Sequence, residues 1–265
     1  MSSAGSSISK QFVPHAVKAG AVVIDNTSAF RMDAATPLVI PEINSDDIRK
    51  HKGVIANPNC SAIIMLMAIA PLHRKNRIRR IVCSTYQSAS GAGAKAMQEL
   101  EEQTREVLAG KTAIKKVFPH QIAFNLFSHN SSIASNGYNE EEIKMIQESK
   151  KILHDDSIRI VVTCIRVPIL RAHSEAIFIE FERKMAPAEA RQIFSKAPGI
   201  KLVDEPKENH FPMPVEASGK DEILVGRIRE DLSCENGLVF FVSGDQLRKG
   251  AALNAIQIAE KLIGA

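Results

Sequence analysis

The sequence predicts an α/β protein in two parts: an incomplete doubly wound parallel sheet, and a larger α+β domain with a mixed or antiparallel sheet. The parallel sheet is predicted from two short apolar runs, Ala21–Asp25 and Val54–Ala56, that alternate with segments of helical spacing. The second part rests on the chain after residue 78, where predicted strands outnumber helices. No G-x-G-x-x-G turn occurs, so the parallel sheet is expected to be incomplete.

Two helices are expected in the first part. Ile8–Ala19 has helical spacing, and we expect Pro14 to start or break that helix. The second helix is expected to begin at Cys60 and to reach about Ala70, where Pro71 would stop it.

The second part is expected to contain five strands and four helices. The strands are Arg79–Tyr86, Ile158–Val167, Glu175–Glu182, Ile223–Ile228 and Leu238–Val242. Within Glu175–Glu182, Ile177, Ile179 and Phe181 share one face and Glu180 and Glu182 share the other, which indicates an antiparallel sheet with one polar face. The helices are Ala94–Leu108 closed by Gly110, a helix capped by Asn139 and Glu142 that runs to Leu153, one starting at Pro187, and Leu247–Ile263.

Composition excludes several classes of protein. Apolar residues make up 45% and charged residues 24% of the chain, which is ordinary for a globular protein with a sizeable core. The net charge of +4 is spread out, so we expect no nucleic-acid partner. The longest apolar stretch, Ala62–Leu72, is too short to span a membrane. The four cysteines form no CxxC pair, which predicts a reduced, cytoplasmic protein without a metal site.

Cys60 is the sharpest chemical feature of the sequence. It follows Asn57-Pro58-Asn59, where a tight turn leads into a helix. The free N–H groups and positive dipole end of a helix N-terminus favour a thiolate and can bind an oxyanion beside it. The alternative is a buried cysteine that packs as a small apolar residue.

His173 is the expected partner of this thiol. It lies where a strand breaks at Pro168 and resumes after Ser174, so its imidazole can face a cleft and exchange protons near neutral pH. Arg166 and Arg171 can hold a carboxylate in the same region. The alternative is a polar loop with a solvated histidine.

Three further residues are candidate contacts to a small anion or an acyl group. Gln87 follows a strand directly, and it can orient a substrate oxygen or satisfy a loop backbone. Arg31 and Lys144 can contact an anion, or they can be ordinary surface charges.

Seven segments, taken together and in order, resemble the aspartate-semialdehyde dehydrogenase family. They are SAFRM (28–32), NPNCSA (57–62), STYQSASGAG (84–93), AFNLFSHN (123–130), NGYNEEE (136–142), CIRVPILRAHSEA (164–176) and GDQLRKGAALNA (244–255). The resemblance covers the chain from about Ser3 to its end, and the ordered set is specific to this family.

The resemblance implies a reaction and a fold. The family oxidises L-aspartate 4-semialdehyde reversibly to 4-aspartyl phosphate, with phosphate and NADP, in the biosynthesis of lysine, threonine, methionine and diaminopimelate. It implies a Rossmann-like remainder of an NADP-binding domain at 1–59, onto which 247–265 packs back, and a catalytic and dimerisation domain at 60–246. A homodimer or homotetramer is implied as well.

The resemblance also implies roles for individual residues. Cys60 matches the nucleophile, His173 the acid/base that deprotonates the thiol and serves the substrate oxygen, and Gln87 the residue that orients the substrate. For the rest of the substrate, Arg166 matches the residue that binds the carboxylate, and Glu141 matches the residue that binds the amino group, with Glu142 as the alternative. The residues that match the phosphate site are Arg31, Asn59 and Lys144. The residues that match positions near the cofactor are Ser88, Ala89, Ser90, Gly91, Gln246 and Asn254.

The chain departs from the family pattern at its start. Family members open with a glycine-rich βαβ unit, and we expect roughly two or three such units to be absent here. Two alternatives therefore stay open: an inactive truncated fragment that acts only as a dimerising domain, and the related N-acetyl-glutamyl-phosphate reductase, whose nucleophile follows glycine where this chain has Asn59.

Overall fold

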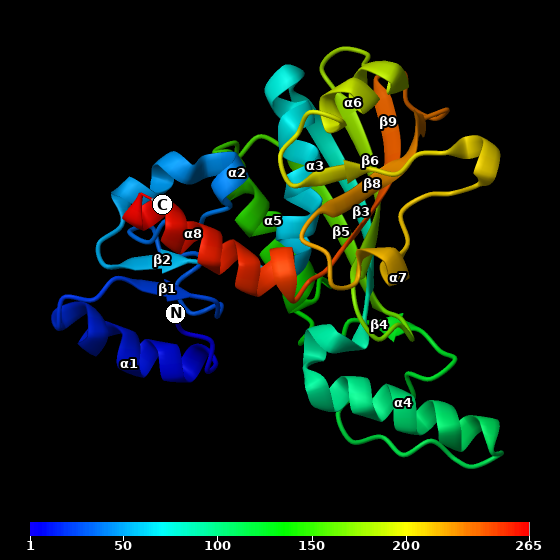
Figure 1. The fold of residues 1–265 in the computed structure, drawn as a ribbon, viewed down its shortest axis with the longest axis horizontal. Coiled ribbons are helices and arrows are strands. Elements are labelled where there is room, and N and C mark those ends of the chain that lie inside the picture. Colours follow the sequence, from blue (N-terminus) through cyan, green and yellow to red (C-terminus); the bar gives the residue numbers. More distant parts are fainter. Residues whose placement is uncertain (265) are drawn as a thin grey trace.

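Two separate β-sheets organise the computed structural model, which describes residues 1–264 (Figure 1). A two-stranded parallel sheet lies near both chain ends, and a seven-stranded mixed sheet forms the larger part. This arrangement confirms the predicted α/β class with a small parallel sheet and a mixed sheet. None of the helices in the described residues is both long and apolar enough to cross a membrane.

The small sheet pairs β1 (Val23–Asp25) with β2 (Val54–Ala56), in register from Val23 and Val54 onward. Helices α1 (Ser6–Lys18), α2 (Pro41–Asn44) and α8 (Leu253–Ile263) and the 3-10 helix η1 (Ser45–Lys50) surround it. Its core joins distant segments, because Ala255 and Ile258 of α8 pack with Ile24, Val39, Ile48 and Ile55.

The large sheet has the strand order β4-β5-β3-β6-β9-β8-β7. Its strands are β3 (Ile78–Gln87), β4 (Phe127–Ser128), β5 (Arg159–Arg166), β6 (His173–Phe181), β7 (Ile200–Leu202), β8 (Ile223–Glu230) and β9 (Gly237–Gly244). β3 runs parallel to β5 and antiparallel to β6, and β7 runs parallel to β8, so the sheet is mixed.

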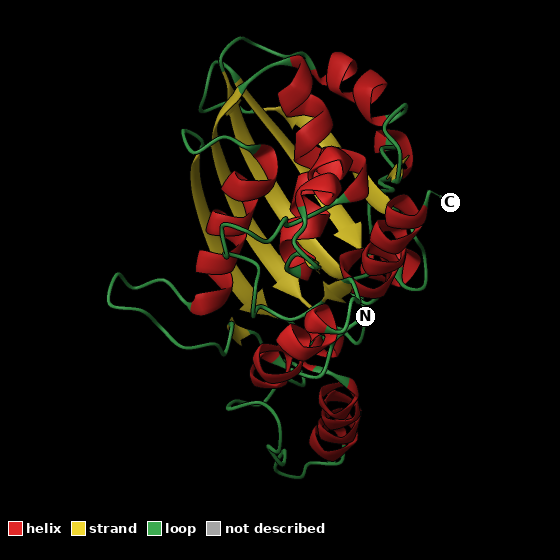
Figure 2. Cartoon of the chain, turned by 90° about the vertical axis from the view of Figure 1, so that its left-hand side faces the viewer, coloured by secondary structure: helices red, strands yellow, loops and turns green. Residues whose placement is uncertain are grey.

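Helices cover one face of this sheet (Figure 2). They are α3 (Cys60–Lys75), α5 (Glu140–Leu153) and α6 (Pro187–Phe194), and α3 is buried along nearly its whole length. Alternation along β6 follows the prediction: Ile177 and Ile179 are buried beneath the helices, whereas Phe178 on the other face is 39% exposed.

An arm projects from the lower end of the large sheet (Figure 1). It contains the 3-10 turn η2 (Ala89–Ala92), helix α4 (Ala94–Leu108) and the loop that returns to β4. The Glu99 carboxylate holds this loop by accepting backbone N–H groups of Lys116, Val117 and Phe118. Two minor helices, η3 (Pro206–Glu208) and α7 (Pro214–Ala217), lie between β7 and β8.

The structure corrects the prediction at two prolines. Pro14 lies inside α1, and Pro71 lies inside α3, which continues to Lys75. A proline removes only one backbone hydrogen bond from a helix. In α3 the neighbouring Leu72 is fully buried, and its carbonyl accepts the Asn76 N–H at 2.9 Å, so packing maintains the last turn.

The closing helix also differs from its predicted form. It starts as a π-helical turn, η4 (Arg248–Ala252), before α8 begins at Leu253. The Asp245 carboxylate accepts the backbone N–H groups of Leu247 and Arg248 and so caps this turn. The short strands β4 and β7 were not predicted, since two or three residues carry no periodic pattern.

Candidate active site

Strand directions bring the predicted site residues to one edge of the large sheet. Gln87 is the last residue of β3, Arg166 is the last of β5, and His173 is the first of β6. Because β3 and β5 are parallel and β6 is antiparallel to β3, these three positions lie at the same end. All three side chains are at least 95% buried.

Cys60 is the half-buried first residue of α3. The Asn59 side chain caps this helix by accepting the N–H groups of Ser61 and Ala62 at 3.0 and 3.1 Å. Burial and the Glu141 carboxylate raise the pKa of Cys60 to about 12, although Arg31 and Arg166 oppose this rise. The thiolate favoured by the helix N-terminus is therefore not the resting form, and the thiol proton must leave during nucleophilic attack.

Glu141 connects the segment around Cys60 to β3. Its Oε1 accepts hydrogen bonds from Asn59 Nδ2 at 2.9 Å and from Gln87 Nε2 at 3.3 Å, and Gln87 Nε2 also donates to Ser61 Oγ at 2.6 Å. Burial alone would raise the pKa of Glu141. In the acidic range where His129 is protonated, its charge, together with the Asn59 hydrogen bond and the charge of Lys144, outweighs burial and lowers the pKa of Glu141. Glu141 is therefore a carboxylate at neutral pH. Glu142, the alternative, is occupied in the capping box with Asn139.

Arg166 is held by three polar groups. Its Nη1 donates to the Ser88 carbonyl at 3.1 Å, its Nη2 lies 2.8 Å from His129 Nε2, and its Nε lies 3.4 Å from Asn130 Oδ1. Burial and Arg166 lower the pKa of His129 to about 4, so a neutral His129 accepts this hydrogen bond. Arg171 lies apart in an ion pair with Asp245 at 2.8 Å. His129 and Asn130 were not predicted, and their one sequence signal is the segment AFNLFSHN.

Arg31 and Asn59 meet through a carboxylate that sequence reasoning missed. Glu148 accepts from Arg31 Nη1 at 3.1 Å and from the Asn59 N–H at 2.6 Å. Burial raises the pKa of Glu148, and Arg31 partly opposes this. Glu148 stands seven residues after Glu141 on α5, on the same helix face, and this spacing was the available signal. Lys144 forms a more exposed ion pair with Glu140 at 2.9 Å.

The turn after β3 carries the predicted cofactor positions. Ala89 N–H and Ser90 N–H donate to the carbonyls of Ile169 and Leu170 at 2.8 and 3.0 Å, which fixes the turn beside the loop preceding His173. A Cβ added at Gly91 would lie 2.9 Å from His173 Cε1 and 3.0 Å from Arg166 Nη1, so glycine is the residue that lets His173 and Arg166 pack this closely against the turn.

Gln246 and Asn254 have different surroundings. Gln246 Nε2 donates to Ser90 Oγ, which places it with the turn after β3. Asn254 is fully buried and bonded to the Val39 carbonyl, to Asn57 and to Lys249. Its amide is thus engaged within the protein and away from that turn.

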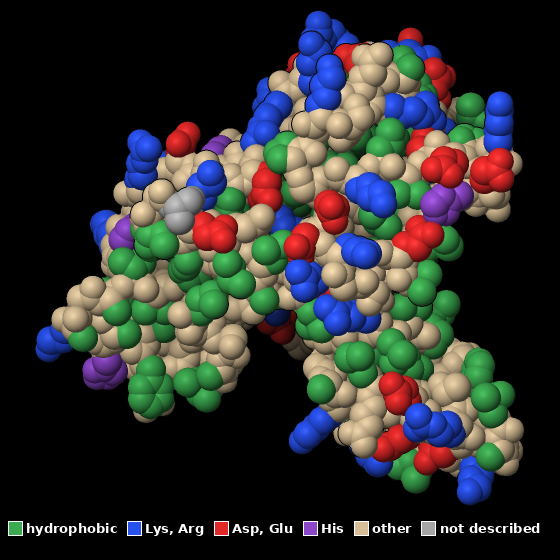
Figure 3. Space-filling model, in the orientation of Figure 1, with side chains coloured by type: hydrophobic (Ala, Val, Ile, Leu, Met, Phe, Trp, Pro, Cys, Tyr) green, Lys and Arg blue, Asp and Glu red, His purple; other side chains and the backbone are tan. Residues whose placement is uncertain are grey.

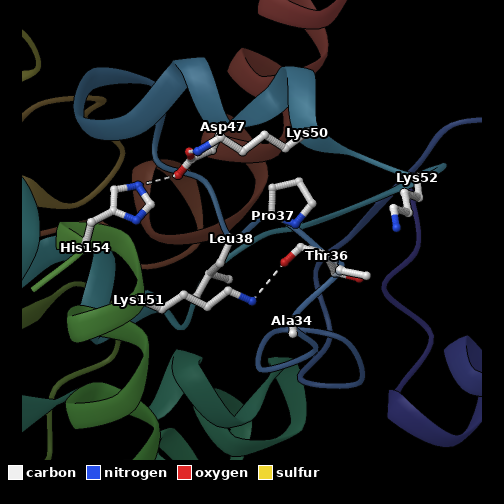
Figure 4. Close-up of a pocket in the computed structure, with 10 residues that line it drawn as sticks. Ala34, Thr36, Pro37, Leu38, Asp47, Lys50, Lys52, Lys151 and His154 are labelled. Atoms are coloured by element: carbon white, nitrogen blue, oxygen red, sulfur yellow. Dashed lines mark hydrogen bonds and ion pairs between the residues drawn. The ribbon is translucent and has the colours of Figure 1, made fainter. Parts of the chain in front are cut away.

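A surface pocket of about 380 Å³ lies elsewhere, beside the small sheet (Figure 4). Two of its three lysines are already engaged, and one of them is Lys151, whose Nζ donates to the carbonyls of Arg31, Asp33 and Thr36. His154 and Lys50 both pair with Asp47. No predicted site residue lines this pocket. Within residues 1–264, no group of three or more His, Cys, Asp or Glu side chains is placed to hold a metal ion.

Comparison with known proteins identifies the family. Residues 1–51 match the family model "Semialdehyde dehydrogenase, NAD binding domain", and residues 69–249 match "Semialdehyde dehydrogenase, dimerisation domain". The aspartate-semialdehyde dehydrogenase of Synechocystis sp. is 54% identical over 263 residues, which are 99% of this chain and 78% of the relative. This chain belongs to the aspartate-semialdehyde dehydrogenase family.

Solved structures agree with this family assignment. Two structures of aspartate semialdehyde dehydrogenase II from Vibrio cholerae, one complexed with ASA, are 43% identical with a TM-score of 0.96. The match covers 99% of this chain and 78% of theirs. A Candida albicans aspartate semialdehyde dehydrogenase solved with NADP shares the fold, with a TM-score of 0.74 at 22% identity over 97% of this chain and 75% of that one. Cys60 lies between the two stretches matched by the family models.

Proposed function

We propose that this aspartate-semialdehyde dehydrogenase oxidises L-aspartate 4-semialdehyde reversibly to 4-aspartyl phosphate, with phosphate and NADP, through a thioester on Cys60. The observation that carries the proposal is the position of Cys60 at the start of α3, with the charges of Glu141, Arg31 and Arg166 acting on its thiol. This set offers a nucleophile, a cation for each acidic group of the substrates and a carboxylate for the ammonium group.

In this proposal each buried group around Cys60 serves one part of the substrate. The Cys60 thiolate attacks the aldehyde carbon to form a thiohemiacetal, which would become a thioester by losing a hydride to the acceptor that NADP supplies. Phosphate then cleaves the thioester, so one difficult step is divided into easier ones. The Arg166 guanidinium holds the substrate carboxylate through paired hydrogen bonds. The Glu141 carboxylate holds the ammonium group, Gln87 orients the substrate, and His173 serves the reacting oxygen.

The phosphate site of the proposal comprises Arg31, Asn59 and Lys144. Arg31 lowers the pKa of Cys60, which supports a positive charge close to the sulfur, where phosphate must attack the thioester. Glu148 competes for Arg31 and for the Asn59 N–H. The raised pKa of Glu148 favours its protonation, which weakens this competition when phosphate arrives.

NADP fits the turn Ser88–Gly91 in this proposal. Gly91 is exposed and has no side chain, so a flat ring could approach the backbone of this turn, and Gln246 stands against Ser90 on the same turn. When bound there, NADP supplies the hydride acceptor. Asn254 remains a candidate only if its internal hydrogen bonds are exchanged.

We further propose a cytoplasmic homodimer or homotetramer in the biosynthesis of lysine, threonine, methionine and diaminopimelate. Large apolar side chains are exposed on the arm and on the uncovered sheet face, namely Phe124, Leu126, Val161 and Phe178, and the arm stands clear of the rest of the chain (Figure 3). Such surfaces favour burial against a second copy. All four cysteines are free, as expected for a reducing compartment. We also propose that residues 1–59, with 247–265 packed back onto them, form one domain and that residues 60–246 form the other.

The decisive experiment is phosphate-dependent NADP reduction by the purified chain with L-aspartate 4-semialdehyde. We expect turnover that Cys60→Ala abolishes and that Cys234→Ala, a second half-buried cysteine away from the site, leaves unchanged. Turnover retained in Cys60→Ala would refute the mechanism. Absent turnover from folded protein with an alkylatable Cys60 would instead indicate a catalytic part without a working cofactor site.

A further inference from the structure

Arg31 is fixed in place by acceptors around its guanidinium group. Its Nε donates to the Asn57 carbonyl at 2.9 Å, its Nη2 to the Asn26 carbonyl at 3.1 Å, and its Nη1 to the Glu148 carboxylate at 3.1 Å. Arg31 and Glu148 are both buried. Each Nη nitrogen carries a second N–H group without a partner among the described residues, so the same fork keeps donors for phosphate beside Glu148.

Helix α5 also holds the loop that carries Arg31. Lys151 lies one turn after Glu148 on this helix. Its Nζ donates to three carbonyls of the loop (Figure 4), those of Arg31, Asp33 and Thr36, at 2.7, 2.8 and 2.8 Å. Glu148 thus holds the side chain of Arg31, and Lys151 holds its backbone. Arg31 cannot turn away from Glu148 without breaking these hydrogen bonds.

The second donor to Glu148 is equally fixed. The Asn59 N–H donates to Glu148 Oε2 at 2.6 Å. The Asn59 side chain is held on both sides, because its oxygen accepts the N–H groups of Ser61 and Ala62 and its amide group donates to Glu141. When an anion arrives at Arg31 and Asn59, the Glu148 carboxylate is therefore the group that must change.

Two anions on one guanidinium group are costly in a buried site. A charged Glu148 already balances Arg31, and phosphate brings further negative charge. Repulsion between like charges is weakly screened inside a protein. A proton on Glu148 removes this repulsion. It also gives the carboxyl group an O–H that can donate to a phosphate oxygen, while the other oxygen still accepts the Asn59 N–H.

We propose that phosphate binding is coupled to protonation of Glu148. In the resting protein the Glu148 carboxylate shares Arg31 and accepts the Asn59 N–H. In the phosphate-bound state a proton from solvent makes Glu148 neutral, and its O–H donates to phosphate. The inference deepens the proposed function, because it rests on the phosphate site at Arg31 and Asn59.

The charges around Glu148 agree with this coupling. Among the described residues, the charged side chains that face it are Arg31 from the loop after β1, and Glu141 and Lys151 from α5 itself. Burial raises the pKa of Glu148 and the charge of Glu141 adds to this, whereas Arg31 and the Asn59 N–H oppose it. The pKa is raised overall, so Glu148 gains a proton at a higher pH than an exposed glutamate does.

The coupling determines the sign of a pH effect on phosphate affinity. Below the pKa of Glu148 the proton is already in place. Above it, each binding event must take up a proton, so the affinity of the parent chain for phosphate falls as pH rises. Phosphate itself titrates in the same way for every variant. The ratio of dissociation constants between the parent and Glu148→Gln therefore isolates the contribution of Glu148.

The direct test is isothermal titration calorimetry of inorganic phosphate with the purified chain and with Glu148→Gln, at pH 5 and pH 8. Glutamine keeps the shape and one acceptor of Glu148 but has no charge. We expect Glu148→Gln to bind phosphate about tenfold more tightly than the parent at pH 8, and the difference to shrink at pH 5. Glu99→Gln on α4 neutralises another buried carboxylate that accepts backbone N–H groups, and it should bind phosphate like the parent.

The outcomes separate the coupling from the phosphate site itself. Equal affinities at pH 8, or weaker binding by folded Glu148→Gln, would refute the coupling and leave the proposed phosphate site in place. An absence of phosphate binding to the parent chain would refute that site, and the inference with it.

Proton uptake by the parent chain tests the inference without any variant. Titrations of phosphate at pH 8 in two buffers of different ionisation enthalpy give the number of protons taken up on binding. We expect net proton uptake by the parent and less by Glu148→Gln. Binding without proton uptake by the parent would refute the inference, even if Glu148→Gln does not fold.

Discussion

The protonation state of Cys60 is set by its neighbours rather than by its helix. Asn59 satisfies two of the free N–H groups at the start of α3, and the Glu141 carboxylate lies close enough to oppose a second negative charge. Burial is the larger cause of the raised pKa of Cys60, ahead of Glu141. The resting protein therefore holds Cys60 as a neutral thiol. In the proposed mechanism, the substrate ammonium group neutralises Glu141 and so lowers the cost of ionising the thiol.

This state predicts the pH dependence of Cys60 alkylation. A pKa of about 12 means that the thiolate fraction rises about tenfold per pH unit throughout the neutral and mildly alkaline range. We expect the rate of reaction with iodoacetamide, measured on Cys234→Ala, to follow this slope from pH 7 to 10. A rate that levels off near pH 8 would show that the thiol is activated at rest.

Substrate binding at Arg166 should depend on the shape of the arginine side chain as well as on its charge. Its guanidinium contacts Ser88, His129 and Asn130 simultaneously, which a lysine ammonium cannot reproduce. We expect Arg166→Lys to raise the KM for the semialdehyde by about tenfold or more. Arg171→Lys is the matched control, since Arg171 pairs with Asp245 and, among the described residues, forms no hydrogen bond with the groups that hold Arg166. An unchanged KM in Arg166→Lys would count against the carboxylate role.

Among the structural elements, the turn after β3 positions most of the site. Its residues Ser88–Gly91 contact both His173 and Arg166, and its backbone is bonded to the loop that precedes His173. The ends of three strands converge at this turn. Small changes in its backbone therefore move catalytic groups supplied by β5 and β6.

Gly91→Ala tests this dependence. The added methyl group would lie 2.9 Å from the His173 ring, and it can be accommodated only if the ring or Arg166 moves. We expect turnover to fall by about 10²-fold with little change in the free energy of unfolding, because Gly91 is exposed and outside the core. Ala92→Ser, next to it on η2, should keep its activity. Full activity in Gly91→Ala would mean that the close packing of Gly91 against His173 and Arg166 is not needed for turnover.

For the whole molecule, the covered face of the large sheet contains an unusual buried carboxyl group. Glu175 is fully buried in β6, two residues after His173, and neither of its carboxyl oxygens has a hydrogen-bond partner among the described residues. Burial raises the pKa of Glu175 well above its usual range, so the folded protein holds this group protonated. The unfolded chain releases that proton near its ordinary pKa.

Glu175 therefore predicts how stability depends on pH. Above the ordinary pKa of glutamate, the folded state binds the extra proton, so the free energy of unfolding falls as pH rises toward the folded pKa, by up to about 1.4 kcal/mol per unit. We expect Glu175→Gln to flatten this decline between pH 5 and 8 in urea unfolding. Glu182→Gln, exposed just after the same strand, should retain the parent slope. A parallel decline in Glu175→Gln and the parent would refute this explanation.

The sequence alone determined much of the fold and of the inventory of the site. Residues 94–108 and 140–153 form helices as predicted, with the Asn139–Glu142 capping box in place, because caps and periodicity depend on neighbours a few residues apart. Cys60 begins its helix for the same reason. The predicted end of the Cys60 helix at Pro71 was wrong, because buried contacts from elsewhere in the fold maintain the helix after Pro71.

Only the tertiary structure decided the charges and partners of these residues. Glu148 reaches Arg31 across 117 positions of sequence, and Gln246 reaches Ser90 across 156. No local pattern encodes such contacts. The direction of a pKa shift depends on burial and on charges brought together by packing. The neutral Cys60 thiol, the occupied Arg31 and the orientation of His173 therefore follow from the way the strands and helices assemble.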